Sequence, residues 1–365
     1  MPTVERGTCH SIFVYDIAFS IDLNEAERRI SSSTRETIKH KRRAPTYFEY
    51  RPAPLRLSQD FARVSITDRL STNPVVELVV YDFGAVTVIY RIPLEGETSS
   101  FLALSANLYE NKQLLTDSRT RVEELLKLIE PAVSKANIAN FVEDYVIFQI
   151  EAFAEPFAIE DLTTRYAQDV AQVLRAEVHD ELSPDEVNDA ISHRISFGKH
   201  DIAIIDWNAA WVVDKEPEDV LTVLEFANVE LLEMRFLDQR LDDALGLAYN
   251  RLSIRSRRWF PFRANTSALR DISQWQVDNA ILFEGVNNVL KLLGDQYLAR
   301  LYRLAAERFH LAEWDGSILR KLETLESIYQ KISDQISTRR MELLEWIIIV
   351  LFMISILLPF VVNLH

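Results

Sequence analysis

The chain carries VYDFGAVTVIY at Val80–Tyr90 and IIDWNAAWVVD at Ile204–Asp214, and these two stretches echo one another. Aligned without gaps, Gly84 falls on Asn208. Glycine and asparagine both tolerate a positive φ, so this register predicts a turn or a bulge in each stretch. The alternative is that two Val- and Ile-rich strands resemble one another by chance.

The echo belongs to a longer pattern, in which a strand, a helix and further strands follow one another twice. Runs rich in Val, Ile and aromatic residues predict strands, and amphipathic runs predict helices. We therefore expect an α+β domain over residues 1–215, with two β-α-β-β units packed as a pseudo-symmetric pair. The expected strands are Ser11–Asp22, Tyr47–Leu57, Val75–Ile92, Tyr145–Phe153, Arg194–Phe197 and Ile202–Val213, and the expected helices are Asn24–Ile30, Ser99–Ile129 and Ile159–Glu177.

From Glu216 the hydrophobic period changes to that of long helices. Apolar residues spaced four and three apart form a heptad seam, which is interrupted at Asp238. A last helix starts near Asp315 and shows the same heptad spacing. A further helix is expected from Ser267 to about His310. Residues 216–340 should form a helical hairpin and a coiled-coil stalk, whose seam faces a helix of the same chain or of a second copy. The seam residues of the last helix are Leu322, Leu325, Tyr329, Ile332 and Ile336.

The end of the chain is a continuous apolar run, WIIIVLFMISILLPFVV, from Trp346 to Val362. Seventeen residues rise about 26 Å as a helix, roughly the thickness of a bilayer's hydrocarbon core. We expect a transmembrane anchor over residues 341–363; the alternative is a buried core helix. Representative anchor residues are Trp346, Ile347, Leu351, Phe352 and Leu358.

The flanks of the apolar run indicate its orientation. Arg339 and Arg340 precede it, and only Asn363, Leu364 and His365 follow it. The positive-inside rule then places the N-terminal domain in the cytoplasm, and a prokaryotic inner membrane is the simplest compartment. The first residues, MPTVERGTCH, show neither a secretory signal nor a transit peptide, which agrees with this expectation.

Composition narrows the classes of function. The 365 residues carry a net charge of −15 and one cysteine, Cys9. A single cysteine forms no internal disulfide and no Cys-based metal cluster, and it favours a reducing compartment. The acidic balance argues against broad binding of phosphate backbones. The chain also lacks the Gly-rich phosphate loops, the H-E-x-x-H motif and the G-x-S-x-G elbow, so no cofactor is expected.

Two sets of polar residues are candidates for chemistry. Asp82 and Asp206 occupy equivalent places in the echo, and a pseudo-symmetric pair of units could bring their carboxylates together for acid–base work or cation binding. The alternative is that both are turn residues. His193 and His200 lie near Asp201, but a metal site needs three or four convergent ligands, so no metal is expected.

Two basic clusters stand out against the acidic background. The first comprises Lys39, Lys41, Arg42 and Arg43, with Arg51 and Arg56 beyond them. In the second, arginines surround aromatic residues, a combination suited to nucleic acid, lipid headgroups or a protein hot spot. The alternative is a connection between helices whose arginines are solvated. The residues of this second patch are Arg255, Arg257, Arg258, Trp259, Phe260 and Arg263.

Several segments resemble the "required for meiotic nuclear division" family, a group of membrane-anchored proteins with a domain of unknown function. The segment most typical of that family is RRMELLEWIIIVL, in which L-E-W stands just before the apolar run. The resemblance covers most of the chain from about Val75. The other segments are VELVVYDFGAVTVIY (Val76–Tyr90), LLEMRFLDQRLDDAL (Leu231–Leu245) and LGDQYLARLYRLAAERFHLAEW (Leu293–Trp314).

The resemblance implies a membrane-anchored scaffold that forms homo-oligomers and has no established catalytic residue. The mitochondrial member supports organellar translation at the inner membrane; this chain departs from it in its acidity and in lacking a transit peptide. We therefore expect a cytoplasm-facing, non-enzymatic scaffold that recruits a protein partner. The alternatives are a ligand-sensing or hydrolytic enzyme with a site between the sheet units, and an RNA or ribosome tether.

Overall fold

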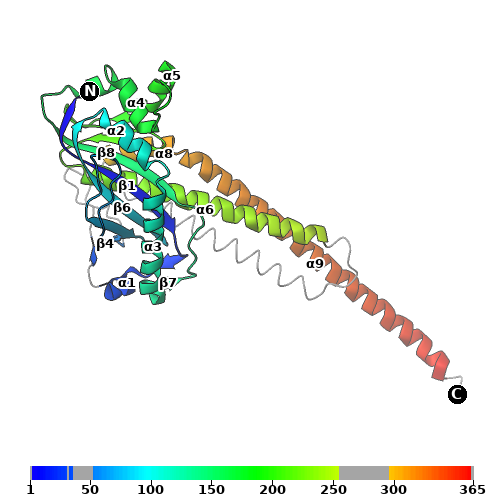
Figure 1. Cartoon of the computed structure of the whole chain (residues 1–365). Coiled ribbons are helices and arrows are strands. Elements are labelled where there is room, and N and C mark those ends of the chain that lie inside the picture. Colours follow the sequence, from blue (N-terminus) through cyan, green and yellow to red (C-terminus); the bar gives the residue numbers. More distant parts are fainter. Residues whose placement is uncertain (1, 31–32, 36–51, 255–295, 363–365) are drawn as a thin grey trace. The chain divides into compact units, whose positions relative to one another are not determined.

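The structure of the chain is a computed structural model that describes residues 2–30, 33–35, 52–254 and 296–362 (Figure 1). Its strands are β1 (Thr3–Asp16), β2 (Ser20–Ile21), β3 (Ser33–Arg35), β4 (Leu55–Asp60), β5 (Val75–Val80), β6 (Ala85–Glu97), β7 (Val133–Ser134), β8 (Glu143–Phe153), β9 (Arg194–Ile195), β10 (Ile202–Ile205) and β11 (Ala209–Val213). Its helices are α1 (Leu23–Arg29), α2 (Ser100–Leu108), α3 (Lys112–Ile129), α4 (Ala167–Arg175), α5 (Pro184–Ala190), α6 (Glu218–Ile254), α8 (Gln296–Arg308) and α9 (Leu311–Val362), with 3-10 turns η1 (Glu130–Ala132) and η2 (Ile159–Thr163).

The chain divides into two compact units. The first comprises Met1–Phe236 and Leu282–Asp315, and the second comprises Leu237–Ile281 and Gly316–His365. The expected boundary at residue 215 therefore lies inside the first unit, which also includes the start of α6 and all of α8. The first unit has the expected mixed α+β character.

The first unit is built on a nine-stranded sheet in the order β3-β4-β5-β6-β1-β8-β11-β10-β9. Neighbouring strands are antiparallel except for β8 and β11, which are parallel. Alternate side chains of β1 enter two cores: Phe13 and Tyr15 pack with α2, α3 and α4, whereas Ile12 and Val14 pack with α6 and α8. Because both faces are covered here, β1 is apolar at four successive positions, Ile12–Tyr15.

The two echoing stretches form two β-hairpins, β5–β6 and β10–β11. In the first turn Gly84 has the expected positive φ, at 106°. In the second turn Asn208 is not among the described residues with a positive φ; instead its side-chain amide donates to the carbonyl of Leu174 at 3.0 Å. The expectation of a positive φ is therefore confirmed at Gly84 and wrong at Asn208.

The two hairpins flank the central strands β1 and β8, but they do not form a two-fold pair. Strand β6 runs antiparallel to β1, whereas β11 runs parallel to β8. The segment from η2 to α5 carries the chain back to the end of the sheet where β8 begins, so β9 runs parallel to β8. Two further reversals leave β11 parallel as well. This direction of β11 breaks the symmetry expected from the sequence.

Local backbone conformation interrupts two of the expected helices. The helix expected over Ser99–Ile129 forms as α2 and α3, because Glu110 has a φ of 49° and Asn111 then caps α3. The helix expected over Ile159–Glu177 forms as η2 followed by α4, which ends at Ala176 with a φ of 54°. A similar left-handed residue, His310, separates α8 from α9.

A buried histidine on the central strand gives the first testable prediction. Burial, with a smaller effect of the charge of Arg91, lowers the pKa of His10 from 6.5 to about 3. Unfolded chains bind this proton near pH 6.5 and folded chains do not, so its contribution to stability is present above pH 6.5 and is lost as the pH falls toward 3. The difference in unfolding free energy between the wild type and His10→Gln should change by about 1.4 kcal/mol per pH unit in this window.

Urea unfolding of both proteins between pH 3 and 8 measures this difference. The control is His179→Gln, which removes a histidine whose side chain is exposed. A slope shared by both variants, or absent from both, would contradict a neutral buried His10.

Candidate functional site

The described end of α9 exposes apolar side chains on all its faces. Trp346 is 67% exposed and Phe352 is 66% exposed. Ile347 and Leu351, also predicted as anchor residues, are exposed too, and Leu358 lies within the helix. Side chains are described as far as Ile356, and among the described residues no helix is long and apolar enough to cross a membrane.

Part of the heptad seam of α9 is buried within a single chain. Leu325 and Ile332 are buried, Leu322 and Tyr329 are half-buried, and Ile336 lies in the helix with its side chain outside the described set. A single chain therefore already buries the two central residues of the seam.

Asp238, which interrupts the seam in the sequence, lies where α6 and α9 meet. Its carboxylate accepts a hydrogen bond from Ser317 at 3.0 Å and forms an ion pair with Lys321 at 2.7 Å. Lys321 also pairs with Asp242 at 2.7 Å. Such polar contacts within an apolar seam fix the register of two helices.

Asp82 and Asp206 are not brought together. Each lies in the turn of its own hairpin, and strands β1 and β8 separate β6 from β11 in the sheet. Three strand spacings amount to about 14 Å, too far for two carboxylates to share a proton or a cation. The site expected between the two sheet units is thus not formed by this pair.

Asp206 instead lies at the centre of a buried ion-pair cluster. Its side chain is fully buried, and its two oxygens receive Nε of Arg175 at 2.9 Å and Nε of Arg308 at 2.6 Å. The N–H of Trp207 donates to the same carboxylate at 2.8 Å, and the Tyr145 hydroxyl donates to the Asp206 carbonyl at 3.0 Å. The cluster joins α4 and α8 to the β10–β11 turn.

Helix α5 completes this cluster. Asp189 accepts hydrogen bonds from Arg175 and from Arg308, and Glu186 pairs with Arg175. The hydrogen bond from Arg308 is the largest of the effects that lower the pKa of Asp189. Burial alone would lower the pKa of Arg308, but Asp189 and Asp206 raise it above its usual value. Three carboxylates thus surround two guanidinium groups, and each charged group contacts at least one of opposite sign, as expected of a structural cluster.

A second buried ion pair links α6 to the sheet. Arg56 on β4 lies 2.9 Å from Glu77 and 3.0 Å from Glu225, and the Tyr81 hydroxyl donates to Glu225 at 2.8 Å. Burial opposes the charge of Arg56, but Glu225 and Glu77 outweigh this effect and raise its pKa. Sequence analysis assigned Arg56 to the first basic cluster, but its acidic partners Glu77 and Glu225 are far from it in the sequence and belong to no short motif, so the ion pair was not predicted.

The remaining sequence candidates give no cluster. The second basic patch, Arg255–Arg263, and the four cations Lys39–Arg43 lie outside the described residues. His200 is exposed, and His193 is half-buried and contacts Ser192 at 2.8 Å. Within the described ranges, no group of three histidine, cysteine, aspartate or glutamate side chains is placed to hold a metal ion.

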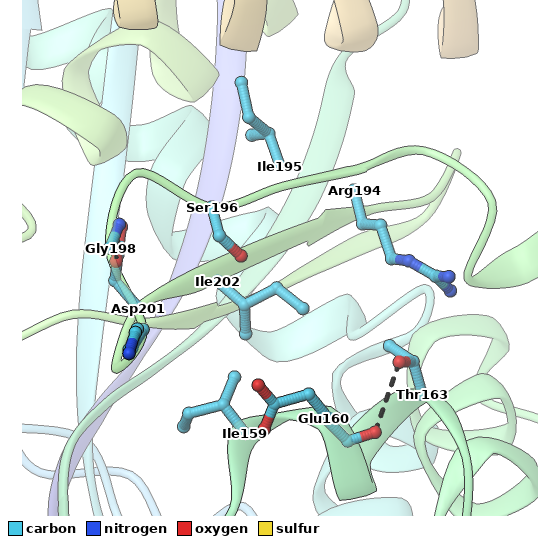
Figure 2. A pocket seen from close by; sticks show the side chains of 10 residues that line it. Ile159, Glu160, Thr163, Arg194, Ile195, Ser196, Gly198, Asp201 and Ile202 are labelled. Carbon is cyan, nitrogen blue, oxygen red and sulfur yellow. Dashed lines mark hydrogen bonds between the residues drawn. The ribbon is translucent and has the colours of Figure 1, made fainter.

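A pocket of about 370 Å³ lies at the β9 edge of the sheet, between η2 and the loop that joins β9 to β10 (Figure 2). The carboxylate of Asp201 accepts the N–H groups of Phe197 at 2.9 Å and of Gly198 at 2.5 Å, and so shapes this loop. No sequence pattern pointed to this pocket. Its lining residues are Ile159, Glu160, Thr163, Arg194, Ile195, Ser196, Gly198, Lys199, Asp201 and Ile202.

Comparisons with known proteins give a family but no activity. "Uncharacterized protein MJ0711" of Methanocaldococcus jannaschii is 23% identical over 281 residues, which cover 74% of this chain and 84% of that protein. No solved structure matches the chain. Neither sequence comparison supports the resemblance to the "required for meiotic nuclear division" family. The family described as "Uncharacterized protein MJ0711, N-terminal domain" matches residues 6–219, and the chain belongs to that family.

Proposed function

We propose that this protein is a membrane-anchored, non-enzymatic scaffold that holds its α+β unit on the cytoplasmic face for a protein partner. The observation that carries the proposal is the exposure of apolar side chains all around α9 from Trp346 to Ile356. Such a surface is unfavourable in water, because removing each exposed methylene from water would contribute about 0.8 kcal/mol of favourable free energy. The apolar run of the sequence continues from Ile356 to Val362, which supports a lipid environment for this helix end.

Lipid is favoured over a second helix as the partner of this segment. A helix that packs against one neighbour keeps a polar face toward water. Ser355 is the one polar residue between Trp346 and Val362, so there is no such face. Arg339 and Arg340 precede the run, which favours a cytoplasmic location for the folded units.

The scaffold role is favoured over an enzyme because the best acidic candidate is used structurally. Asp206 is engaged by Arg175 and Arg308 and has no room for a substrate. The proposal includes self-association, which would have to use surfaces other than Leu325 and Ile332, since one chain already buries them.

Two arginines placed in the apolar run test the anchor. Val350→Arg combined with Ile354→Arg should move the full-length protein from the floating membrane fraction of a density gradient to the soluble or aggregated fractions. The reason is that each arginine near the centre of a span costs about 2.5–3.5 kcal/mol of insertion free energy.

The matched control combines Glu342→Arg with Glu345→Arg, which places two arginines just outside the apolar run. This variant should still float with membranes. A wild-type protein that does not float, or a Val350→Arg/Ile354→Arg protein that does, would overturn the anchor. Flotation is preferred to sedimentation because aggregated protein does not float.

A further inference from the structure

The pocket at the β9 edge presents both signs of charge around an apolar floor. Glu160 lies on the η2 side, and Arg194 and Ser196 lie on the β9 side (Figure 2). Lys199 adds a second cation from the loop. The floor is formed by isoleucines, and the side chains of Ile159 and Ile202 are buried.

The opposite charges of this pocket do not neutralise one another. Within the described part of the chain, Glu160, Arg194 and Lys199 form no ion pair, although they line the same hollow. Arg194 makes one long hydrogen bond, to the carbonyl of Ile191 at 3.3 Å. Asp201, by contrast, is committed to two loop N–H groups.

We propose that this pocket binds a free α-amino acid with an aliphatic side chain. The ammonium group would pair with Glu160, the carboxylate with Arg194 and Lys199, and the side chain would cover the isoleucine floor. A zwitterion fits because it satisfies both signs of free charge, whereas a simple anion would leave Glu160 beside a second negative charge. The pocket volume of about 370 Å³ lies at the small end of the range of ligand pockets.

The inference goes beyond the scaffold role, because it assigns a ligand to the unit that the scaffold would present. One feature of the pocket sets the expected affinity. It is open, so its charges are partly screened by solvent. We therefore expect weak binding, with a dissociation constant in the millimolar range, which corresponds to about 4 kcal/mol of binding free energy.

The test uses the full-length, detergent-solubilised protein and three probes of similar shape: L-leucine, 4-methylpentanoate without the ammonium group, and 3-methylbutylamine without the carboxylate. Binding is measured by saturation-transfer NMR. Leucine should bind at least tenfold more tightly than either analogue. Glu160→Gln should weaken leucine binding about tenfold and should not weaken 4-methylpentanoate binding, because it removes a like charge beside that anion. Arg194→Gln should weaken leucine binding similarly and should not weaken 3-methylbutylamine binding, for the corresponding reason.

Glu155→Gln and Arg165→Gln are matched controls, since both residues are exposed nearby and neither lines the pocket. The replaced pocket side chains are exposed as well, so unchanged unfolding temperatures are expected for all four variants. Failure to detect leucine binding at about 20 mM, roughly 20-fold the expected dissociation constant, would overturn the proposal. Equal binding of 4-methylpentanoate and leucine would overturn it too, because that result describes an anion site.

Discussion

Replacing Asp206 with alanine should lower the free energy of unfolding by about 3–5 kcal/mol, since removing one partner of a buried ion pair leaves the others uncompensated. Arg175 and Arg308 would both lose their shared carboxylate, and their side chains are only 10% exposed. The N–H of Trp207 would lose its acceptor as well. Urea unfolding of the full-length protein, followed by tryptophan fluorescence, measures the change.

Asp82→Ala is the control for this prediction, because Asp82 occupies the equivalent place in the other hairpin and is not part of the cluster. Its effect should be about 1 kcal/mol or less, typical of a half-buried turn residue. Asp206→Asn should fall between the two, since it retains hydrogen bonding and loses the charge. Equal effects of Asp206→Ala and Asp82→Ala would restore the interpretation of both aspartates as equivalent residues.

A turn or bulge within each of the two echoing stretches could be predicted from sequence, because glycine and asparagine are local signals for one. The expectation of a single strand over Val75–Ile92 and over Ile202–Val213 is nevertheless wrong, since each stretch forms the two strands of a hairpin. The direction of β11 relative to β8 has no such signal. It depends on how the segment between Phe153 and Arg194 crosses the sheet, which similar strands cannot reveal.

The partners of Asp206 could not be predicted for a related reason. Arg175 is 31 residues away and Arg308 is 102 residues away. The first arginine reads as an ordinary basic residue in the last turn of a helix, and the second lies in a segment outside the family match. Identical aspartates in two similar turns therefore acquired different roles through tertiary contacts alone.

Gly84→Ala should destabilise the protein by about 2–6 kcal/mol, through two separable effects. The φ of 106° is strained for any residue with a Cβ, at a cost of about 1–3 kcal/mol. A Cβ at this position would also lie 1.8 Å from the carbonyl oxygen of Ala18. Relieving that overlap requires a backbone shift, which adds about 1–3 kcal/mol. The shift would also disturb the hydrogen bond from the N–H of Ile17 to the carbonyl of Gly84.

Gly96 separates the two effects, because it has a similar φ of 100° and nothing within 4 Å of its would-be Cβ. Gly96→Ala should therefore cost only the φ term, about 1–3 kcal/mol, and the difference between the variants measures the overlap with Ala18. If Gly84→Ala and Gly96→Ala lowered the free energy of unfolding equally, the overlap with the Ala18 carbonyl would contribute nothing, and the explanation from close backbone approach would be wrong. Asn208, aligned with Gly84 in the sequence, should accept alanine without a φ penalty and lose only its hydrogen bond to Leu174. Two aligned turns would then owe their stability to different physical causes, a close backbone approach in one and a side-chain hydrogen bond in the other.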